Sequence, residues 1–331
     1  MRKTFNWGIL GAGSIAQKFA SDLALLPHAN LVAIGSRSQQ RADDFASQFN
    51  VNKAYGSYEA FVSDPDIEIV YIASRHVGHY PDTLLCLNHG KPVLCEKPVA
   101  MNRAQFEKMV SLAKENRLFF MEALWTRFLP SFIKCKEIVE SGAIGEVRLI
   151  EADFCFHPPY HPEGRLFNPR LGGGALLDVG IYPLFFAFEL GSAVTDLKAS
   201  ATLDKNGIDT CCSMLLSHEK GEQSVLTSTI DSNGRVEALV HGTEGTVRLN
   251  KWWHTPTSID LLLDNKEVEH LSFDEPGNGY QYEADEVMSC LKKGKQESER
   301  WSWEKSRKLI ATLDRIREIT GIKYPEDIES V

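Results

Sequence analysis

Three stretches of the sequence carry residues whose types and spacing could do chemistry. The first is Glu96-Lys97-Pro98, in which two charged residues directly follow the short apolar run 92–95. That run is too short for a helix and is typical of a buried strand, after which Pro98 makes the chain turn. Ligands of open α/β sheets bind outside the carboxyl ends of the strands. Lys97 therefore belongs either to a site or to a surface turn, and this stretch by itself leaves both open.

The second stretch is a glycine pattern near the N-terminus. Gly11-Ala12-Gly13-Ser14-Ile15-Ala16 follows the apolar strand 7–10 and opens an amphipathic helix. In that context G-x-G-x-x-A indicates dinucleotide binding: Gly11 for the tight turn, Gly13 for the approach of a pyrophosphate to the helix N-terminus, and Ala16 for close packing. Ser14 and Ile15 complete the predicted phosphate loop. The alternative is a glycine turn that binds nothing.

The residues after the second strand bear on the choice of dinucleotide. An NAD site asks for Asp or Glu at the end of strand 31–35, but the chain has Ser36 and Arg37 there, with Arg41 one helical turn later. A guanidinium group can hold a 2′-phosphate with two hydrogen bonds. We therefore predict NADP, with NAD less favoured. The alternative is that Arg37 and Arg41 are merely solvated, although the start of a helix disfavours positive charge.

The third stretch lies in the second half of the chain. Three consecutive glycines, 172–174, precede a predicted helix that contains Asp178 and Tyr182, which are four residues apart and share a face. Consecutive glycines cost backbone entropy, so they suggest that something passes very close. The alternative is a flexible loop before a helix in which Tyr182 is a half-buried core aromatic.

These residues need elements that bring them together. Apolar strands alternate with helices up to residue 122, which predicts a doubly wound parallel sheet of the Rossmann type. Right-handed crossovers place the carboxyl ends of the first, fourth and fifth strands on one side, next to the same crevice. The residues expected there are Gly11, Ser74, His79 and Lys97.

The second half changes to strands that follow one another with hairpin residues between them, from 146 to 263. This pattern predicts a large, mostly antiparallel open sheet, and an apolar face of such a sheet would suit a homodimer interface. We therefore predict an α/β dinucleotide-binding domain over 1–124 and an α+β substrate-binding and dimerisation domain over 125–331. The C-terminal helix of the second domain can pack back on the first.

Composition excludes several classes of protein. The chain has 331 residues, 43% of them hydrophobic, with a net charge of -9 that argues against nucleic acid or an anionic membrane as a partner. No apolar run was found that approaches the roughly 18 residues needed to cross a bilayer. The seven cysteines show no CxxC spacing, which favours a reducing, cytoplasmic compartment. No metal site is expected; His157 and His161 are a weak ligand pattern better read as a polar loop.

Taken together, the three motifs resemble the Gfo/Idh/MocA oxidoreductase family. The resemblance covers nearly the whole chain and is closest to the branch of dimeric dihydrodiol dehydrogenase, NADP-dependent xylose dehydrogenase and glucose-fructose oxidoreductase. It implies that Lys97 and Tyr182 are the catalytic pair and that Asp178 lies beside them in the substrate site. Most other members have His at the position of Tyr182. Many also have Pro-Asn where this chain has Ser74-Arg75, which makes the nicotinamide-side contacts less certain.

Further site residues follow from the resemblance. It suggests cofactor contacts through the loops after the fourth, fifth and sixth strands, and substrate contacts in the second domain. The cofactor group comprises Ser74, His76, His79, Glu96, Lys97, Trp125 and Arg127, and the substrate group Phe154, His157, Arg165, Asp178 and Tyr182. A tryptophan packed between domains is the alternative for Trp125.

The expected chemistry is oxidation of an alcohol. A phenol can take the hydroxyl proton if a neighbouring ammonium group lowers its pKa from about 10, which Lys97 would do for Tyr182 while Glu96 steadies Lys97. Direct proton transfer by Lys97 is the rival. The substrate is expected to be a small molecule, either the C1 hydroxyl of an aldose, which we favour from the sequence, or a vicinal trans-dihydrodiol. Two other functions stay open: a non-catalytic NADP-sensing regulator and an NAD-dependent glycosidase of the same fold.

Overall fold

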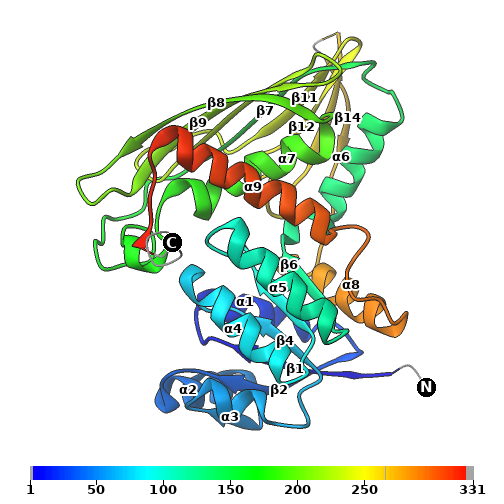
Figure 1. The fold of residues 1–331 in the computed structure, drawn as a ribbon. Helices are drawn as coiled ribbons and strands as arrows, with labels where there is room; N and C mark the ends of the chain where they lie inside the picture. Colours follow the sequence, from blue (N-terminus) through cyan, green and yellow to red (C-terminus); the bar gives the residue numbers. More distant parts are fainter. Residues whose placement is uncertain (1–2, 265, 326–331) are drawn as a thin grey trace. The chain divides into compact units, whose positions relative to one another are not determined.

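A computed structural model describes residues 3–264 and 266–325 of the chain (Figure 1). The chain forms two compact units, each built from two segments. The first unit comprises Met1–Trp125 and Glu275–Arg307, and the second comprises Thr126–Asp274 and Lys308–Val331. This division differs from the two continuous domains expected from the sequence, because a late segment belongs to the first unit.

The first unit contains a six-stranded parallel sheet with the strand order β3-β2-β1-β4-β5-β6. That order is the doubly wound arrangement of dinucleotide-binding folds, so the predicted Rossmann sheet is confirmed. β4, β5 and β6 are buried at every position, as strands covered on both faces must be. The strands are β1 Phe5–Leu10, β2 Ala29–Gly35, β3 Lys53–Tyr55, β4 Ile69–Ile72, β5 Val93–Glu96 and β6 Phe120–Ala123.

Helices connect these strands, and several begin where a polar side chain caps them. Ser38, Ser57 and Asn102 each accept a hydrogen bond from the backbone N–H three residues later, at the starts of α2, α3 and α5. The helices are α1 Ser14–Leu23, α2 Gln39–Phe49, α3 Tyr58–Val62, α4 His76–Asn88, α5 Arg103–Glu115 and α8 Gln281–Lys292. The short helix η1 Trp125–Phe128 and the long helix α9 Trp303–Thr320 both continue across the unit boundary.

Buried hydrogen bonds explain why residues 275–307 belong to the first unit. The buried carboxylate of Asp22 in α1 accepts hydrogen bonds from the backbone N–H groups of Asn278 and Tyr280, both at 2.9 Å. At the end of β6, Glu122 accepts from the Trp301 indole at 3.1 Å and from the Ser306 hydroxyl at 2.6 Å. These partners lie between 179 and 258 positions apart in the chain, so sequence patterns do not reveal them.

The second unit contains an eight-stranded sheet with the order β14-β13-β12-β11-β7-β10-β9-β8. Neighbouring strands are antiparallel except β7 and β10, which run parallel, so the predicted mostly antiparallel sheet is confirmed. The last strand, β14, was not expected from the sequence. The strands are β7 Val147–Cys155, β8 Val194–Leu203, β9 Asp209–His218, β10 Gln223–Thr229, β11 Ala238–Gly242, β12 Gly245–Leu249, β13 Ile259–Leu263 and β14 Lys266–Leu271.

One helical stretch forms the core of the second unit. It contains the short helix η2 Pro169–Leu171, a π-helical turn η3 Leu176–Gly180 and helix α7 Ile181–Leu190, and α7 packs against β7 and β10; the other helix of this unit is α6 Pro130–Glu140. Contrary to the expectation from the sequence, the stretch Pro169–Leu190 is long and apolar enough to cross a membrane. Within the protein, however, 89% of its apolar window is buried, which accounts for its composition.

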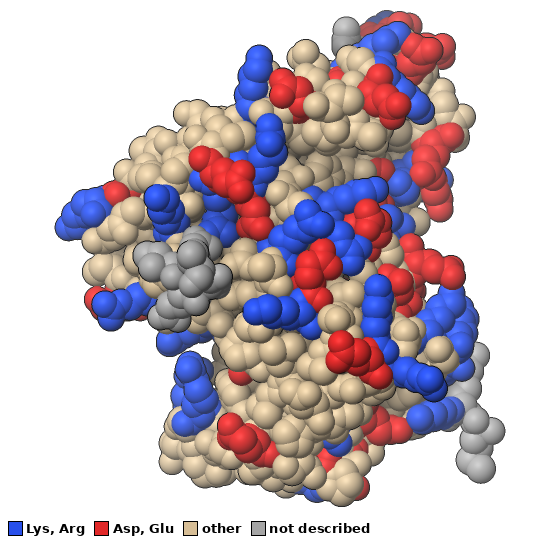
Figure 2. Space-filling view, viewed as in Figure 1, with Lys and Arg blue, Asp and Glu red and all other residues tan. Residues whose placement is uncertain are grey.

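Charged side chains of both signs are interspersed over the face of the molecule shown in Figure 2. This mixture agrees with a chain that carries 36 basic and 45 acidic residues. The absence of a nucleic-acid partner remains a prediction from the net charge.

Candidate cofactor and substrate sites

The glycine loop between β1 and α1 has the geometry of a pyrophosphate site. Gly11 has a φ angle of +107°, and a Cβ atom there would lie 2.6 Å from the carbonyl oxygen of Ala73, so the turn itself requires glycine. A Cβ on Gly13 would meet no protein atom within 4 Å, which leaves open space over the loop. No side chain in the described structure caps α1 at Gly13, so the amides of Ser14 to Ala16 can face a ligand. The loop therefore fits a dinucleotide.

Positive charge gathers at the carboxyl ends of β2 and β4. Arg37 and Arg41 are exposed, and the Arg41 guanidinium also donates to the carbonyl oxygen of Ala12 at 2.9 Å, which ties α2 to the glycine loop. Burial raises the pKa of Tyr58, and the charges of Arg37, Arg41 and Arg75 oppose that rise. All three guanidinium groups thus act near Tyr58. Arg75 was not among the expected contacts, although an exposed basic residue after a strand is a recognisable signal.

Two serines that were expected to contact the cofactor lie in the same region. Ser36 is buried, and its hydroxyl accepts a hydrogen bond from the Ser38 N–H at 3.4 Å. The Ser74 hydroxyl lies close to Gly78, where a Cβ atom would be 2.9 Å away. Both serines therefore shape the loops that carry Arg37 and Arg75.

His79 joins the loops that follow β4 and β5. It is only 1% exposed, and its two ring nitrogens face the carbonyl oxygens of Pro98 at 2.7 Å and Ser74 at 3.2 Å. Burial, with a contribution from the positive charge of Lys97, lowers the pKa of His79 to about 4, so the ring is neutral and donates to one carbonyl. In this structure its side chain holds the two loops together, and the expected contact of His79 with a cofactor stays a prediction. The nearby His76 ring lies edge-on to it, with centroids 5.7 Å apart.

Two buried carboxyl groups bind the backbone of the Glu96-Lys97-Pro98 turn. Glu96 accepts a hydrogen bond from the Tyr71 hydroxyl and another from the backbone N–H of Lys97 at 3.1 Å. Glu122 of β6 accepts a hydrogen bond from the backbone N–H of Val99 at 3.0 Å. Lys97 therefore sits on a turn whose backbone is fixed on both sides.

The Trp125-Arg127 segment lies at the boundary between the units. Trp125 belongs to the first unit and stacks on Tyr280, with ring centroids 4.3 Å apart. Arg127 belongs to the second unit, where its guanidinium pairs with the buried Glu189 at 3.0 Å. In this structure Arg127 takes part in an internal ion pair, and its expected contact with a cofactor stays a prediction.

The second unit brings together Arg165, Asp178 and Tyr182 on or beside one helical stretch. Asp178 and Tyr182 are 3% and 5% exposed, and lie in the π-helical turn and in α7. The Arg165 guanidinium donates to the Asp178 carboxylate at 2.6 Å. The Arg165 side chain is 58% exposed, so the pair is reached from solvent at one end. Two residues expected in the substrate site are thereby shown to be in contact.

Aromatic rings surround Tyr182. The Phe154 ring lies 5.6 Å from the Tyr182 ring, and His254 lies 5.1 Å from it and stacks on Phe154 at 4.0 Å. Trp252 stands edge-on to Phe154 at 6.3 Å and is 44% exposed. The Thr126 hydroxyl holds the backbone of His254 at 2.7 Å. Trp252 and His254 were missed by sequence reasoning, because they come from a loop about 70 residues after Tyr182 and follow no motif.

His157 is the expected site residue with the least structural support. It is exposed, and the contact described for it is a hydrogen bond from its backbone N–H to the Asn233 side chain at 3.2 Å. Among the described residues, no group of three or more His, Cys, Asp or Glu side chains could hold a metal ion. His157 thus lies on the surface of the second unit, and its contact with a substrate stays a prediction.

Comparison with known proteins adds independent evidence. A family model described as an oxidoreductase family with an NAD-binding Rossmann fold matches residues 5–124, and the GFO/IDH/MocA C-terminal domain matches residues 132–248. The trans-1,2-dihydrobenzene-1,2-diol dehydrogenase of Mus musculus is 38% identical over 97% of this chain and 98% of its own length. The Homo sapiens protein of the same name is 34% identical with the same coverage.

Solved structures share the fold at lower identity. An aldose-aldose oxidoreductase from Caulobacter crescentus, complexed with glycerol, has a TM-score of 0.89 at 23% identity. A 3-ketoreductase from Actinomadura kijaniata, in complex with NADP and TDP-benzene, has a TM-score of 0.86 at 24% identity. Each comparison covers 96% of this chain and 98% of the other chain.

Proposed function

The chain belongs to the GFO/IDH/MocA oxidoreductase family, and we propose that it is an NADP(H)-dependent dehydrogenase of trans-dihydrodiols. The family and the NAD(P)-binding Rossmann domain confirm the expectations from the sequence. The proposal changes one of those expectations, since the sequence alone favoured a sugar.

The observation that carries this choice is the aromatic surround of Tyr182. A flat, partly unsaturated ring can pack against Phe154 and Trp252, whereas a sugar needs many hydrogen-bonding partners. The exposed end of the Arg165–Asp178 pair offers charged hydrogen-bonding groups for the two hydroxyls of a diol. The relatives that are 34–38% identical carry dihydrodiol dehydrogenase names, which supports the same substrate class.

Exposed arginines support NADP over NAD. Arg37 and Arg41 follow β2, where an NAD site places a carboxylate, and Arg75 adds a third guanidinium group near them. A bound nicotinamide supplies the acceptor for the hydride. The residues of the chain then supply binding, orientation and proton transfer.

In the proposed reaction, Tyr182 takes the proton of the substrate hydroxyl and Lys97 assists it with positive charge. Asp178, held by Arg165, orients the substrate. Glu96 and Glu122 hold the backbone of the turn that carries Lys97 through hydrogen bonds. The His79 ring contacts the carbonyl oxygen of Pro98 in the same turn. Proton transfer by Lys97 itself is the alternative assignment of the base.

The test is the absorbance of reduced nicotinamide with the purified full chain. We expect turnover of trans-1,2-dihydrobenzene-1,2-diol with NADP⁺, a weaker response to NAD⁺, and little response to D-xylose, D-glucose or myo-inositol. Tyr182→Phe should lower kcat by about 10²–10⁴-fold, the range for loss of an acid–base group. Fast turnover of a sugar and not of the diol would overturn the substrate assignment.

Two variants sharpen this test. Trp252→Ala should raise the KM for the diol and leave the KM for NADP⁺ unchanged, because the ring faces Phe154 and His254. The matched control is Tyr160→Ala, which removes another exposed aromatic side chain, one that packs on Phe167. Tight NADP⁺ binding without any turnover would favour the regulator, and hydrolysis of a glycoside without net NADP⁺ reduction would favour the glycosidase.

We also propose that the eight-stranded sheet forms a homodimer interface. Leu215 and Val225 are opposite each other in the β9–β10 ladder and are 37% and 44% exposed. A second copy of the chain would bury this apolar pair. Sedimentation velocity should show a dimer that Val225→Lys dissociates, while Val268→Lys on the edge strand β14, at 53% exposure, should not.

A further inference from the structure

The glycine run before Asp178 is shaped by the protein itself. A Cβ on Gly173 would lie 2.7 Å from the carbonyl oxygen of Leu166. Gly174 has a φ angle of +121°, and a Cβ there would lie 2.1 Å from a carboxyl oxygen of Asp209. The close approach that three glycines suggest is therefore an approach of Asp209 and of the chain's own backbone.

Asp209 is the first residue of β9, and it is fully buried. Its carboxyl group accepts a hydrogen bond from the backbone N–H of Leu176 at 2.6 Å. Leu176 begins the π-helical turn, and the first N–H groups of a helical segment have no partner within the segment. A negative charge at that end is also favoured by the helix dipole. Asp209 thus caps the segment from a strand 33 positions away.

A second contact holds the same turn from the other side. The Tyr324 hydroxyl donates to the carbonyl oxygen of Gly173 at 2.7 Å. The Arg317 guanidinium lies over the Tyr324 ring, 4.8 Å from its centroid, and its charge favours the ionised form of Asp209. Gly173 and Leu176 are therefore both fixed to the surrounding unit.

We propose that Asp209 is a positioning residue for the dehydrogenase reaction. By fixing the start of the helical segment it sets where Asp178, two residues later, and Tyr182, six residues later, present their side chains. This inference rests on the proposed function, since it concerns the same site. Asp209 does not contact the substrate in this assignment; it acts through the backbone of residues 174–178.

The ionisation of Asp209 offers a readout that a purely structural contact would lack. Burial raises the pKa of Asp209 to about 7, against the opposing effect of hydrogen bonds from the Leu176 and Ala175 amides and of Arg317. Tyr324, Cys211 and Cys212 are the other titratable groups near it. Protonation below pH 7 removes the charge that binds the Leu176 amide, so the alignment of Tyr182 should weaken in acid.

The experiment compares Asp209→Asn and Asp209→Ala with wild type in the diol assay. Misplacing a reacting group by about 1 Å can cost about 10²-fold in rate, so we expect Asp209→Ala to lower kcat by about that factor. Asp209→Asn keeps a neutral acceptor and should fall by about 10-fold, an intermediate loss. The KM for NADP⁺ should stay unchanged in both, because the glycine loop lies in the other unit.

The matched control is Asp204→Asn in the same β8–β9 hairpin. Asp204 accepts from the backbone N–H groups of Asn206 and Ile208, in its own turn, so kcat should remain at the wild-type value. In wild type and in Asp204→Asn, kcat should decline as the pH falls, with a midpoint near pH 7. In Asp209→Asn this decline should be absent.

The possible outcomes separate this inference from the proposed function. An inactive wild-type chain would overturn both. An active wild type with Asp209→Asn and Asp209→Ala equal to it in kcat and pH profile would overturn the inference alone. If Asp209→Ala does not fold, the isosteric Asp209→Asn decides the question, and an unchanged acid decline in that variant would count against the inference.

Discussion

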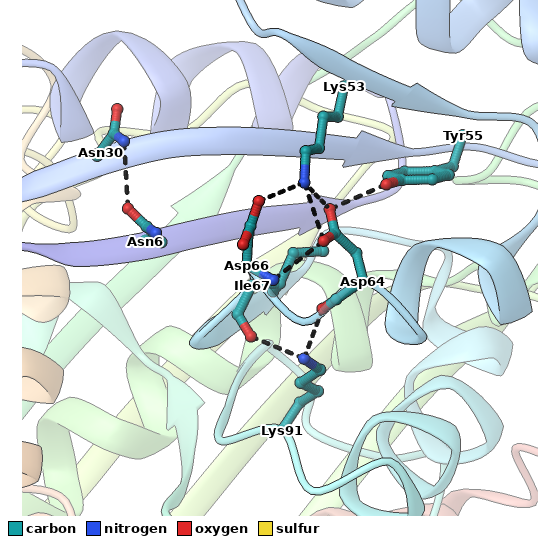
Figure 3. Close-up of polar contacts among 8 residues, drawn as sticks. All are labelled: Asn6, Asn30, Lys53, Tyr55, Asp64, Asp66, Ile67 and Lys91. Carbon is teal, nitrogen blue, oxygen red and sulfur yellow. Dashed lines mark hydrogen bonds and ion pairs between the residues drawn. The ribbon is translucent and has the colours of Figure 1, made fainter.

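Charged side chains have different surroundings at the two ends of the parallel sheet in the first unit. At the amino end, in the loops that precede β3, β4 and β5, Lys53 pairs with Asp64 at 2.9 Å and with Asp66 at 2.6 Å (Figure 3). The Tyr55 hydroxyl donates to Asp64 at 2.9 Å, and the Lys91 ammonium group donates to the carbonyl oxygens of Asp64 and Ile67 (Figure 3). Each cation there has an oxygen partner.

Near Glu96, the last residue of β5, one buried carboxyl group is not paired in this way. Glu283 of α8 is fully buried, and neither of its carboxyl oxygens has a hydrogen-bond partner among the described residues. Burial, with the charges of Glu96 and Asp22, raises its pKa well above the usual range. The His79 ring is kept neutral at the same end. At the amino end, hydrogen bonds favour the ionised form of Asp64, whereas burial near Glu96 and Lys97 favours the neutral forms of Glu283 and His79. Buried groups of the second kind are candidates for functional sites.

The comparison implies that changes at Lys97 alter activity, whereas changes in the network around Asp64 alter stability. The largest effect is expected at Lys97. Lys97→Ala should lower kcat with the diol by about 10²–10⁴-fold, because it removes the charge that assists proton transfer. The unfolding midpoint in urea should barely move. A large loss of stability with little loss of kcat would contradict the division between the two ends.

The second largest effect is expected at Asp64. Asp64→Ala removes the shared hydrogen-bond acceptor of Lys53 and Tyr55, so the free energy of unfolding should fall by about 1–3 kcal/mol, as when a buried hydrogen-bond partner is removed. The kcat should not change. Asp66→Ala is the control, because Asp66 is 62% exposed and its ion pair should contribute less than about 1 kcal/mol.

The effect of Asp64 should also depend on pH. Burial raises the pKa of this carboxyl, but hydrogen bonds from the Asp66 N–H, Lys53 and Tyr55 outweigh burial and lower it overall. A lowered pKa means that the stabilisation is present above the unfolded value of about 3.9 and is lost as the pH falls through the folded value. The difference between wild type and Asp64→Ala in urea unfolding should therefore shrink in acid. A difference that stays constant down to pH 3 would contradict this account.

A smaller effect is expected at the glycine loop. Gly13→Ala places a methyl group in space that no protein atom occupies, so folding should be nearly unaffected while the Kd for NADPH rises by about 10-fold or more. Fluorescence titration and urea unfolding measure the two quantities. Gly11→Ala is the contrasting variant, since its Cβ would clash with the Ala73 carbonyl and should reduce both stability and binding.

The smallest effect, and one of opposite sign, is expected at Glu283. Its raised pKa means that folding is favoured below the unfolded value of about 4.3 and loses free energy as the pH rises above it. Glu283→Gln should therefore match wild type near pH 4 and be more stable by about 1 kcal/mol at neutral pH. Glu286→Gln, one turn along α8, should instead be neutral or destabilising because Glu286 accepts from Ser298. Equal destabilisation by Glu283→Gln at both pH values would refute this prediction.

Local sequence patterns were enough to predict most helices and strands, and the residues whose conformation depends on their near neighbours in the chain. Gly11 and Gly13 could be assigned because the steric limits of a tight turn and a helix N-terminus act over a few residues. Lys97 could be placed at a strand end for the same reason, since Pro98 ends the strand locally. Apolar strands alternating with helices predicted the first sheet. Successive strands with hairpin residues between them predicted the second, although β14 was missed in a mostly charged segment.

The partners and surroundings of these residues depend on segments that are distant in the chain. Asp209 reaches Leu176 across 33 positions, Asp22 reaches Tyr280 across 258, and Trp252 and His254 join Phe154 from a separate loop. Arg127 also pairs with Glu189, a contact that no local sequence pattern indicates. Such contacts depend on strand order and on burial, and a carboxyl group buried by distant segments carries no mark of that burial in its neighbours along the chain. The functional groups of a side chain follow from the sequence, whereas its burial and its partners depend on the tertiary structure.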